Sequence, residues 1–177
     1  MIEALYLESV RTRFAEEKSL GGRTMQQLTA EQLLWQPNEA SNSIALIVQH
    51  LHGNMLSRWT NFLTEDGEKE WRQRDAEFEP RALTADEVLA LWEEGWSVLF
   101  AALDALRAED LVRRIHIRAQ PLTVVDAINR QLAHYSYHVG QIVTLGKWLR
   151  GNNWNSLSIA RGQSRQFTET LKSGLPQ

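Results

Sequence analysis

Apolar side chains recur every three or four residues along four segments of the chain, which is the spacing of helices that face a core. The first segment covers residues 2 to about 20, where Gly21 and Gly22 are expected to stop or break the helix, which could resume through Met25 and Leu28. The second covers about 43 to 63, and Ser41, Asn42 or Ser43 can cap its start. Its apolar stripe consists of Ile44, Val48, Leu51, Met55, Trp59 and Phe62.

Two capping signals begin the other two predicted helices. The run Thr-Ala-Asp-Glu at 84–87 is a capping box, and the helix that it begins extends to about residue 106. Thr123 begins the longest helix, which continues to residue 149 before Gly151 ends it. The pattern therefore predicts an all-α bundle in which these four segments are the main helices, and the length of 177 residues favours one domain over residues 1–177.

The remaining segments are predicted to connect or cover these helices. Residues 64–82 are dense in charge but contain Trp71 and Phe78, so we expect a long connection that the two aromatic side chains pin to the bundle and that could act as a lid. Residues 107–120 alternate apolar and polar side chains, which indicates an extended connection or a small hairpin. The polar tail from Asn152 should pack on the bundle through Trp154, Leu157, Ile159, Phe167 and Leu171.

Composition excludes several classes of function. A net charge of -3 and a pI near 6.0 offer no basic surface for phosphate groups, so nucleic acid is not expected as a partner. The chain contains no cysteine, which excludes disulfides, thiolate ligands and a cysteine nucleophile. The start of the chain does not resemble a secretory signal, and no run approaches the roughly 18 apolar residues of a membrane span. We therefore expect a cytoplasmic protein with no membrane association.

Histidines form the one pattern that suggests chemistry. His134 and His138 lie four residues apart, so one helical face carries both rings within about 6 Å of each other. A third ligand could come from the second helix, where His50 and His52 point about 200° apart and cannot serve the same ion. Periodicity does not choose between them. The alternative is a chance pair of half-buried rings bonded to backbone or tyrosine.

Three neutral imidazoles would suit zinc, nickel or iron(II) and would leave at least one coordination position open. The chain has neither the Glu-x-x-His pairs of carboxylate di-iron bundles nor a His-Glu-x-x-His motif. A metal site would therefore take only histidines from the protein. An open position favours catalysis or ligand binding over a purely structural role.

Two stretches resemble the DinB/YfiT-like superfamily. Residues 132–142 (Leu-Ala-His-Tyr-Ser-Tyr-His-Val-Gly-Gln-Ile) match its C-terminal signature, and residues 43–51 (Ser-Ile-Ala-Leu-Ile-Val-Gln-His-Leu) match its His-Leu helix, which selects His50 over His52. Trp-Gln-Pro at 35–37 and the tail at 154–164 also fit, the tail resembling an uncharacterised branch. The resemblance implies a four-helix bundle, a metal site of His50, His134 and His138, and frequently a homodimer.

The resemblance also implies two functions. Some members of the superfamily are transferases or isomerases that use a low-molecular-weight thiol, which suggests a metal-dependent S-transferase acting on a small-molecule substrate, or a hydrolase that activates water at the same ion. The alternative is a non-catalytic stress-response or small-molecule-binding module whose metal is structural or vestigial. No general acid or base stands in a recognisable motif, and this keeps the alternative open.

Three further residues are weaker candidates for the site. Asn54 and Gln141 lie about one turn from a histidine and could orient the rings. Arg130, one turn before His134, could meet an anionic substrate, although a solvated or ion-paired surface arginine is its commoner role. A homodimer contact could form on the outer side of the fourth helix, where three residues are small: Ala133, Ser136 and Gly140.

Overall fold

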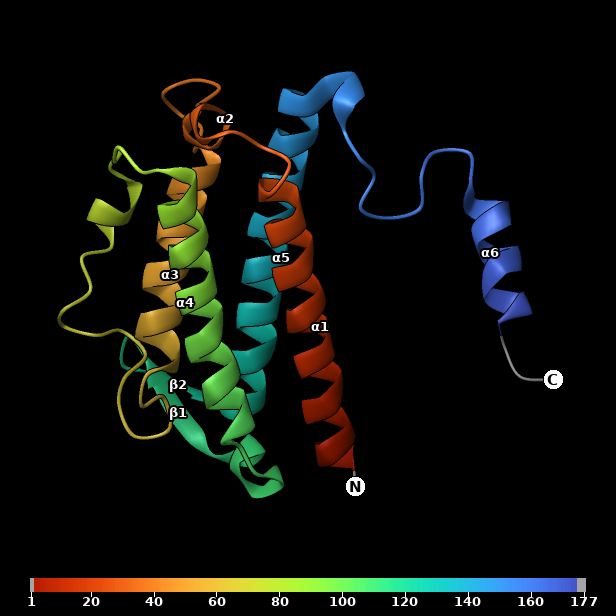
Figure 1. Cartoon of the computed structure of the whole chain (residues 1–177). Coiled ribbons are helices and arrows are strands. Elements are labelled where there is room, and N and C mark those ends of the chain that lie inside the picture. Colours follow the sequence, from red (N-terminus) through yellow and green to blue (C-terminus); the bar gives the residue numbers. More distant parts are fainter. Residues whose placement is uncertain (1, 175–177) are drawn as a thin grey trace.

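Four long helices form the body of the protein in a computed structural model that describes residues 2–174. They are α1 (Ile2–Met25), α3 (Ile44–Trp59), α4 (Ala85–Asp104) and α5 (Val124–Arg150), and they lie side by side as a bundle (Figure 1). The shorter elements are α2 (Ala30–Leu34), η1 (Asp75–Phe78), η2 (Ala108–Val112), β1 (Arg114–Ile117), β2 (Gln120–Thr123), η3 (Gly151–Asn153) and α6 (Ser164–Ser173). The helical bundle predicted from the sequence is thus the observed architecture.

Aromatic side chains fill the middle of the bundle and connect all four helices. Phe14 of α1, Trp96 of α4 and Tyr135 of α5 are fully buried, with the ring centroids of Trp96 and Tyr135 5.7 Å apart. Trp59 of α3 donates from Nε1 to the Tyr135 hydroxyl at 3.0 Å, and that hydroxyl donates to Oδ1 of Asn54 at 3.0 Å. This buried chain of hydrogen bonds fixes the position of α3 against α5, since each polar atom would be costly without its partner.

The first helix does not stop at its two glycines, contrary to the sequence prediction. It continues to Met25 because Gly21 lies where the ring of Trp92 packs against α1. A Cβ at Gly21 would come within 2.6 Å of that ring. The glycine therefore permits a close approach between α1 and α4 instead of ending the helix.

The other three helices begin where their caps predict. The side chains of Ser43, Thr84 and Thr123 each accept a hydrogen bond from a backbone amide in the first turn. α3 ends at Trp59, four residues earlier than expected, and Asn61 then takes a positive φ of 49°. α4 and α5 match the predicted ranges to within two residues.

The connection before α5 contains a hairpin, which is the second of the two alternatives that its sequence indicated. Strands β1 and β2 pair antiparallel, and the two residues between them, Arg118 and Ala119, both have positive φ, as in a type I′ turn. Neither residue is a glycine, so the turn needs support. Asp66 supplies it by accepting hydrogen bonds from both backbone amides, at 2.8 and 2.7 Å. The connection between α3 and α4 is thereby attached to the hairpin.

The same connection is anchored to α3, but only one of its aromatic side chains contributes as expected. Ser57 donates to the carbonyl of Gly67, and the Gly67 amide donates to the carbonyl of His116. Phe78 packs against the body of the protein, whereas Trp71 is 56% exposed, so the prediction that Trp71 pins the connection is wrong. Charged and backbone groups hold this segment where an apolar anchor was expected.

The tail packs on the bundle only in its first part. Trp154 and Leu157 are half-buried, and Asn155 exchanges two hydrogen bonds with Gln27, which lies in the turn after α1. Helix α6 stands apart from the bundle, with Phe167 and Leu171 46% and 58% exposed (Figure 1). The expectation that the whole tail covers the bundle is therefore wrong for α6, whose two large apolar side chains offer little area to offset the ordering of the polar linker.

No helix in the part of the chain that the structure describes is both long enough and apolar enough to cross a membrane.

Candidate metal centre

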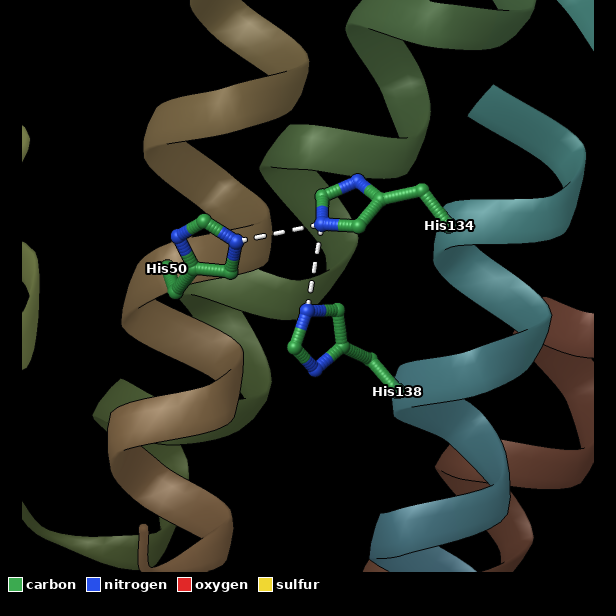
Figure 2. Close-up of side chains that lie close together, drawn as sticks. All are labelled: His50, His134 and His138. Atoms are coloured by element: carbon green, nitrogen blue, oxygen red, sulfur yellow. Dashed lines mark hydrogen bonds between the residues drawn. The ribbon is translucent and has the colours of Figure 1, made fainter. Parts of the chain in front are cut away.

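Three histidine rings meet in the space between α3 and α5. His50 projects from α3, and His134 and His138 project from successive turns of α5 (Figure 2). Nε2 of His134 lies 3.2 Å from Nε2 of His50 and 3.1 Å from Nε2 of His138. One ligand nitrogen from each ring lies within 4.8 Å of the other two. The rings therefore converge on one point.

Protein groups on the far side of two rings determine which nitrogen carries the proton. Nδ1 of His50 lies 2.9 Å from a carboxylate oxygen of Glu77, and Nδ1 of His138 lies 2.8 Å from Oε1 of Gln141. Both oxygens can only accept, so both Nδ1 atoms donate. In the neutral rings of His50 and His138, Nε2 therefore presents a lone pair to the centre of the cluster.

This arrangement leaves too few protons at the centre of the cluster. His134 can donate from Nε2 to one neighbouring ring but not to both, so at least one close pair of nitrogens would face each other through lone pairs. A divalent ion would satisfy all three nitrogens at once. Tetrahedral coordination with metal–nitrogen bonds near 2.0–2.1 Å places ligand nitrogens about 3.3 Å apart, close to the 3.1 and 3.2 Å observed. The ligand nitrogens of His50 and His138 lie within 4.8 Å of each other, so the three histidines could hold a metal ion once these two rings approach to the same separation.

Glu77 is held firmly against His50 by the rest of the connection. Its carboxylate accepts two hydrogen bonds from Arg72, at 2.7 and 2.9 Å, and Gln49 donates to its backbone carbonyl. Burial alone would raise the pKa of Glu77, but the hydrogen bonds from His50 and Arg72 outweigh burial and the pKa is lowered. The group facing His50 is thus a carboxylate, and it fixes both the orientation and the tautomer of that ring.

A glycine in α3 makes this contact possible. A Cβ on Gly53 would collide with the carboxyl group of Glu77, so a larger residue at this position would displace the carboxylate from His50. Phe78, the next residue of η1, stacks on the ring of His50 with centroids 4.8 Å apart. The connection thus holds His50 by a hydrogen bond at one edge and by a ring on one face.

Burial keeps the two rings of α5 neutral. Removal from water lowers the pKa of His134 to about 3, with further lowering by its two neighbouring histidines. Burial likewise lowers the pKa of His138 to about 4, although the hydrogen bond with Gln141 opposes this shift. At neutral pH both rings are therefore in the form that binds metals.

The weaker candidates occupy different positions around the cluster. Gln141 contacts His138 directly. Asn54 lies one helical turn after His50, and its Oδ1 accepts a hydrogen bond from the Tyr135 hydroxyl. Arg130 lines a pocket beside the cluster together with Asn54. His52 faces α4, where Nε2 lies 3.0 Å from a carboxylate oxygen of Glu94, so it stands outside the cluster.

Comparison with known proteins identifies the family. A family model described as "Protein of unknown function (DUF1572)" matches residues 1–163. The chain belongs to this family. The fold is similar to the crystal structure of a DinB-like protein from Bacillus cereus ATCC 10987, with a TM-score of 0.62, 16% identity, and coverage of 80% of this chain and 91% of the other. The resemblance to the DinB-like superfamily is therefore confirmed at the level of the fold. No functionally curated protein matches the chain.

Sequence reasoning did not find Glu77. It lies 27 residues from His50 in a segment where many side chains are charged, and no periodicity relates the two. The signal that could have found its contact is Gly53. A glycine inside an apolar helix costs about 1 kcal/mol and often marks a close approach by another part of the chain.

The low pKa values predict that the metal-free protein loses stability in mild acid. The unfolded chain binds protons at His134 and His138 below its ordinary pKa of 6.5, whereas the folded chain does so only near pH 3 to 4. Stability is therefore fully present above about pH 6.5 and falls as pH decreases through this window. Urea unfolding with a chelator at about pH 7.5 and about pH 5 would measure the difference. In a His134→Gln, His138→Gln double variant, the free energy of unfolding should differ less between the two pH values. A difference as large as that of wild type would contradict the role of these two histidines in the loss of stability.

Proposed function

We propose that this protein binds one divalent transition-metal ion, zinc, nickel or iron(II), through His50, His134 and His138, and that it is a metal-dependent transferase acting with a low-molecular-weight thiol. The observation that carries the metal proposal is the convergence of three Nε2 atoms with too few protons between them. The thiol chemistry is suggested by the resemblance of residues 43–51 and 132–142 to the DinB/YfiT-like superfamily, some of whose members use a low-molecular-weight thiol.

Each residue around the centre has a defined task in this proposal. The three histidines hold the ion and leave at least one position for a small molecule, while Glu77 and Gln141 keep the lone pairs of His50 and His138 directed inward. When bound, the ion lowers the pKa of a coordinated thiol or water. Arg72 keeps Glu77 ionised, so the carboxylate stays an acceptor for His50.

Thiol transfer suits this site because it needs no separate general base. Among the described residues, no carboxylate lines the pocket beside His50 and His134, and the carboxylate of Glu77 is already occupied by Arg72 and His50. A hydrolase would use the same ion and the same open position. The lack of a free acid or base in the pocket also favours a second candidate, a non-catalytic stress-response or small-molecule-binding module with a structural or vestigial metal.

We also propose that the protein is a homodimer through the outer side of α5. Gly140 is open there, with nothing within 4 Å of a Cβ placed on it, and Ala133 is exposed. Ser136 donates to Glu17 of α1, so α1 covers part of the same side. Equilibrium sedimentation at micromolar concentration should give twice the monomer mass, and a monomer would refute the dimer.

Metal analysis tests the centre directly. The untagged protein should carry about one zinc, nickel or iron ion per chain, in line with a three-histidine site. His50→Ala, His134→Ala and His138→Ala should each lose the ion, because two imidazoles cannot hold it at the same affinity. His52→Ala is the matched control and should keep it, since His52 pairs with Glu94. A protein that binds no metal after reconstitution would refute the proposal.

The same preparation separates the two candidate functions. Protein reconstituted with cobalt(II) should develop a thiolate-to-metal absorption band when a low-molecular-weight thiol is added, and should then transfer that thiol to an electrophile. A metal-loaded protein that shows neither the band nor turnover would refute the transferase and leave the binding module.

Glu77 should strengthen metal binding without touching the ion. Glu77→Gln weakens the acceptor at Nδ1 of His50, so the metal dissociation constant should rise about 10-fold to 100-fold. Glu94→Gln makes the same change beside His52 and should leave metal affinity unchanged. Gly53→Ala should reproduce the effect with no change in charge, because its Cβ displaces Glu77. Competition with a chromophoric chelator measures all three, and equal affinities for Glu77→Gln and Glu94→Gln would contradict this role.

A further inference from the structure

A pocket of about 240 Å³ lies between α3 and α5, on the side of the histidines that faces the hairpin. His50 and His134 form part of its wall, so it opens onto the candidate metal centre. Most of the remaining wall is arginine. These side chains come from α3, the connection after it, the hairpin turn and α5: Arg58, Arg72, Arg74, Arg118 and Arg130.

The acidic groups nearby do not balance these arginines. Glu68 lies 2.9 Å from both Arg58 and Arg118, and the carboxylate of Glu77 accepts two hydrogen bonds from the guanidinium group of Arg72. Asp75, which is fully exposed, lies 3.8 Å from Arg74. Five guanidinium groups thus face three carboxylates, an excess of two positive charges around the pocket, and guanidinium groups repel one another unless an anion lies among them.

Two of the arginines retain unused hydrogen-bonding capacity. The side chain of Arg72 is 2% exposed, and its Nη1 is buried with no hydrogen-bond partner, since the nearest carboxylate oxygen, on Glu68, is 3.8 Å away. A buried guanidinium donor normally has an acceptor. Arg130 forms no ion pair with any residue that the structure describes, and it lies at the mouth of the pocket, exposed to solvent.

We propose that this pocket binds the oxyanion group, a carboxylate or a phosphate, of a small molecule. Arg130 and Arg74 meet the anion at the surface, and Arg72 is the buried donor at the inner end. Planar guanidinium groups match the geometry of both oxyanions. This inference rests on the proposed function in one respect. The rest of the small molecule that carries the oxyanion would reach the open coordination position of the metal ion beside His50 and His134. It narrows the substrate of that site to an anion.

Calorimetric titration of the metal-free protein with inorganic phosphate and, separately, with malonate tests the pocket at low ionic strength. Both wild type and Arg165→Gln, which removes an equal charge from α6, should show saturable binding of at least one anion with the same dissociation constant. Arg130→Gln should raise that constant about tenfold, as expected for one charge-assisted hydrogen bond, and Arg74→Gln should also raise it. The anion that binds more tightly identifies the group that the pocket prefers.

His138→Ala distinguishes this inference from the metal proposal, because His138 does not line the pocket. The variant should lose the metal and keep anion affinity within about twofold of wild type. An absence of saturable binding for both anions, or equal affinities in Arg130→Gln and Arg165→Gln, would overturn the anion site while leaving the metal proposal intact. Anion binding by a protein that takes up no metal would support the anion site and refute the metal proposal.

Discussion

Three imidazole nitrogens face one another between α3 and α5 without enough protons to satisfy them, and the surrounding structure preserves this arrangement. Hydrogen bonds from Trp59 to Tyr135 and from Tyr135 to Asn54 fix the two helices at the level of the cluster. Acceptors on the outer edges of the rings hold the Nδ1 protons away from the centre. Such preorganisation is costly in an empty site and favourable in an occupied one, which is why it points to a ligand for the nitrogens.

The bundle can offset this cost because its core is large and the cluster lies only at the edge of it. Phe14, Trp96 and Tyr135 are fully buried and connect α1, α4 and α5. The histidines lie at the flank of this core, where they lose enough water to stay neutral but still border a pocket. A site at the flank therefore combines the low dielectric that tunes the rings with access for a small molecule.

The sequence predicts the fold and part of the cluster for a clear physical reason. Helical periodicity places His134 and His138 on one face, and caps locate the helix starts to within two residues. Periodicity cannot select His50 over His52, because the choice depends on how α3 faces its neighbours; the superfamily resemblance selected His50, and the structure brings it to the cluster. Glu77 was missed since tertiary contacts alone determine its position. The prediction that the helix ends at Gly21 was wrong for the same reason, because Gly21 makes room for the ring of Trp92, a tertiary contact.

One carboxylate links the two halves of the site. Glu77 accepts hydrogen bonds from His50 and from Arg72, so it orients a candidate metal ligand and partly neutralises an arginine of the neighbouring pocket. If Glu77 moved away, His50 would lose its hydrogen-bond acceptor, and at the same time Arg72 would lose its main counter-charge. The geometry of the metal centre and the charge of the anion pocket are therefore not independent. A small molecule that carried an oxyanion at one end and a metal-binding atom at the other would use both features of this arrangement at once.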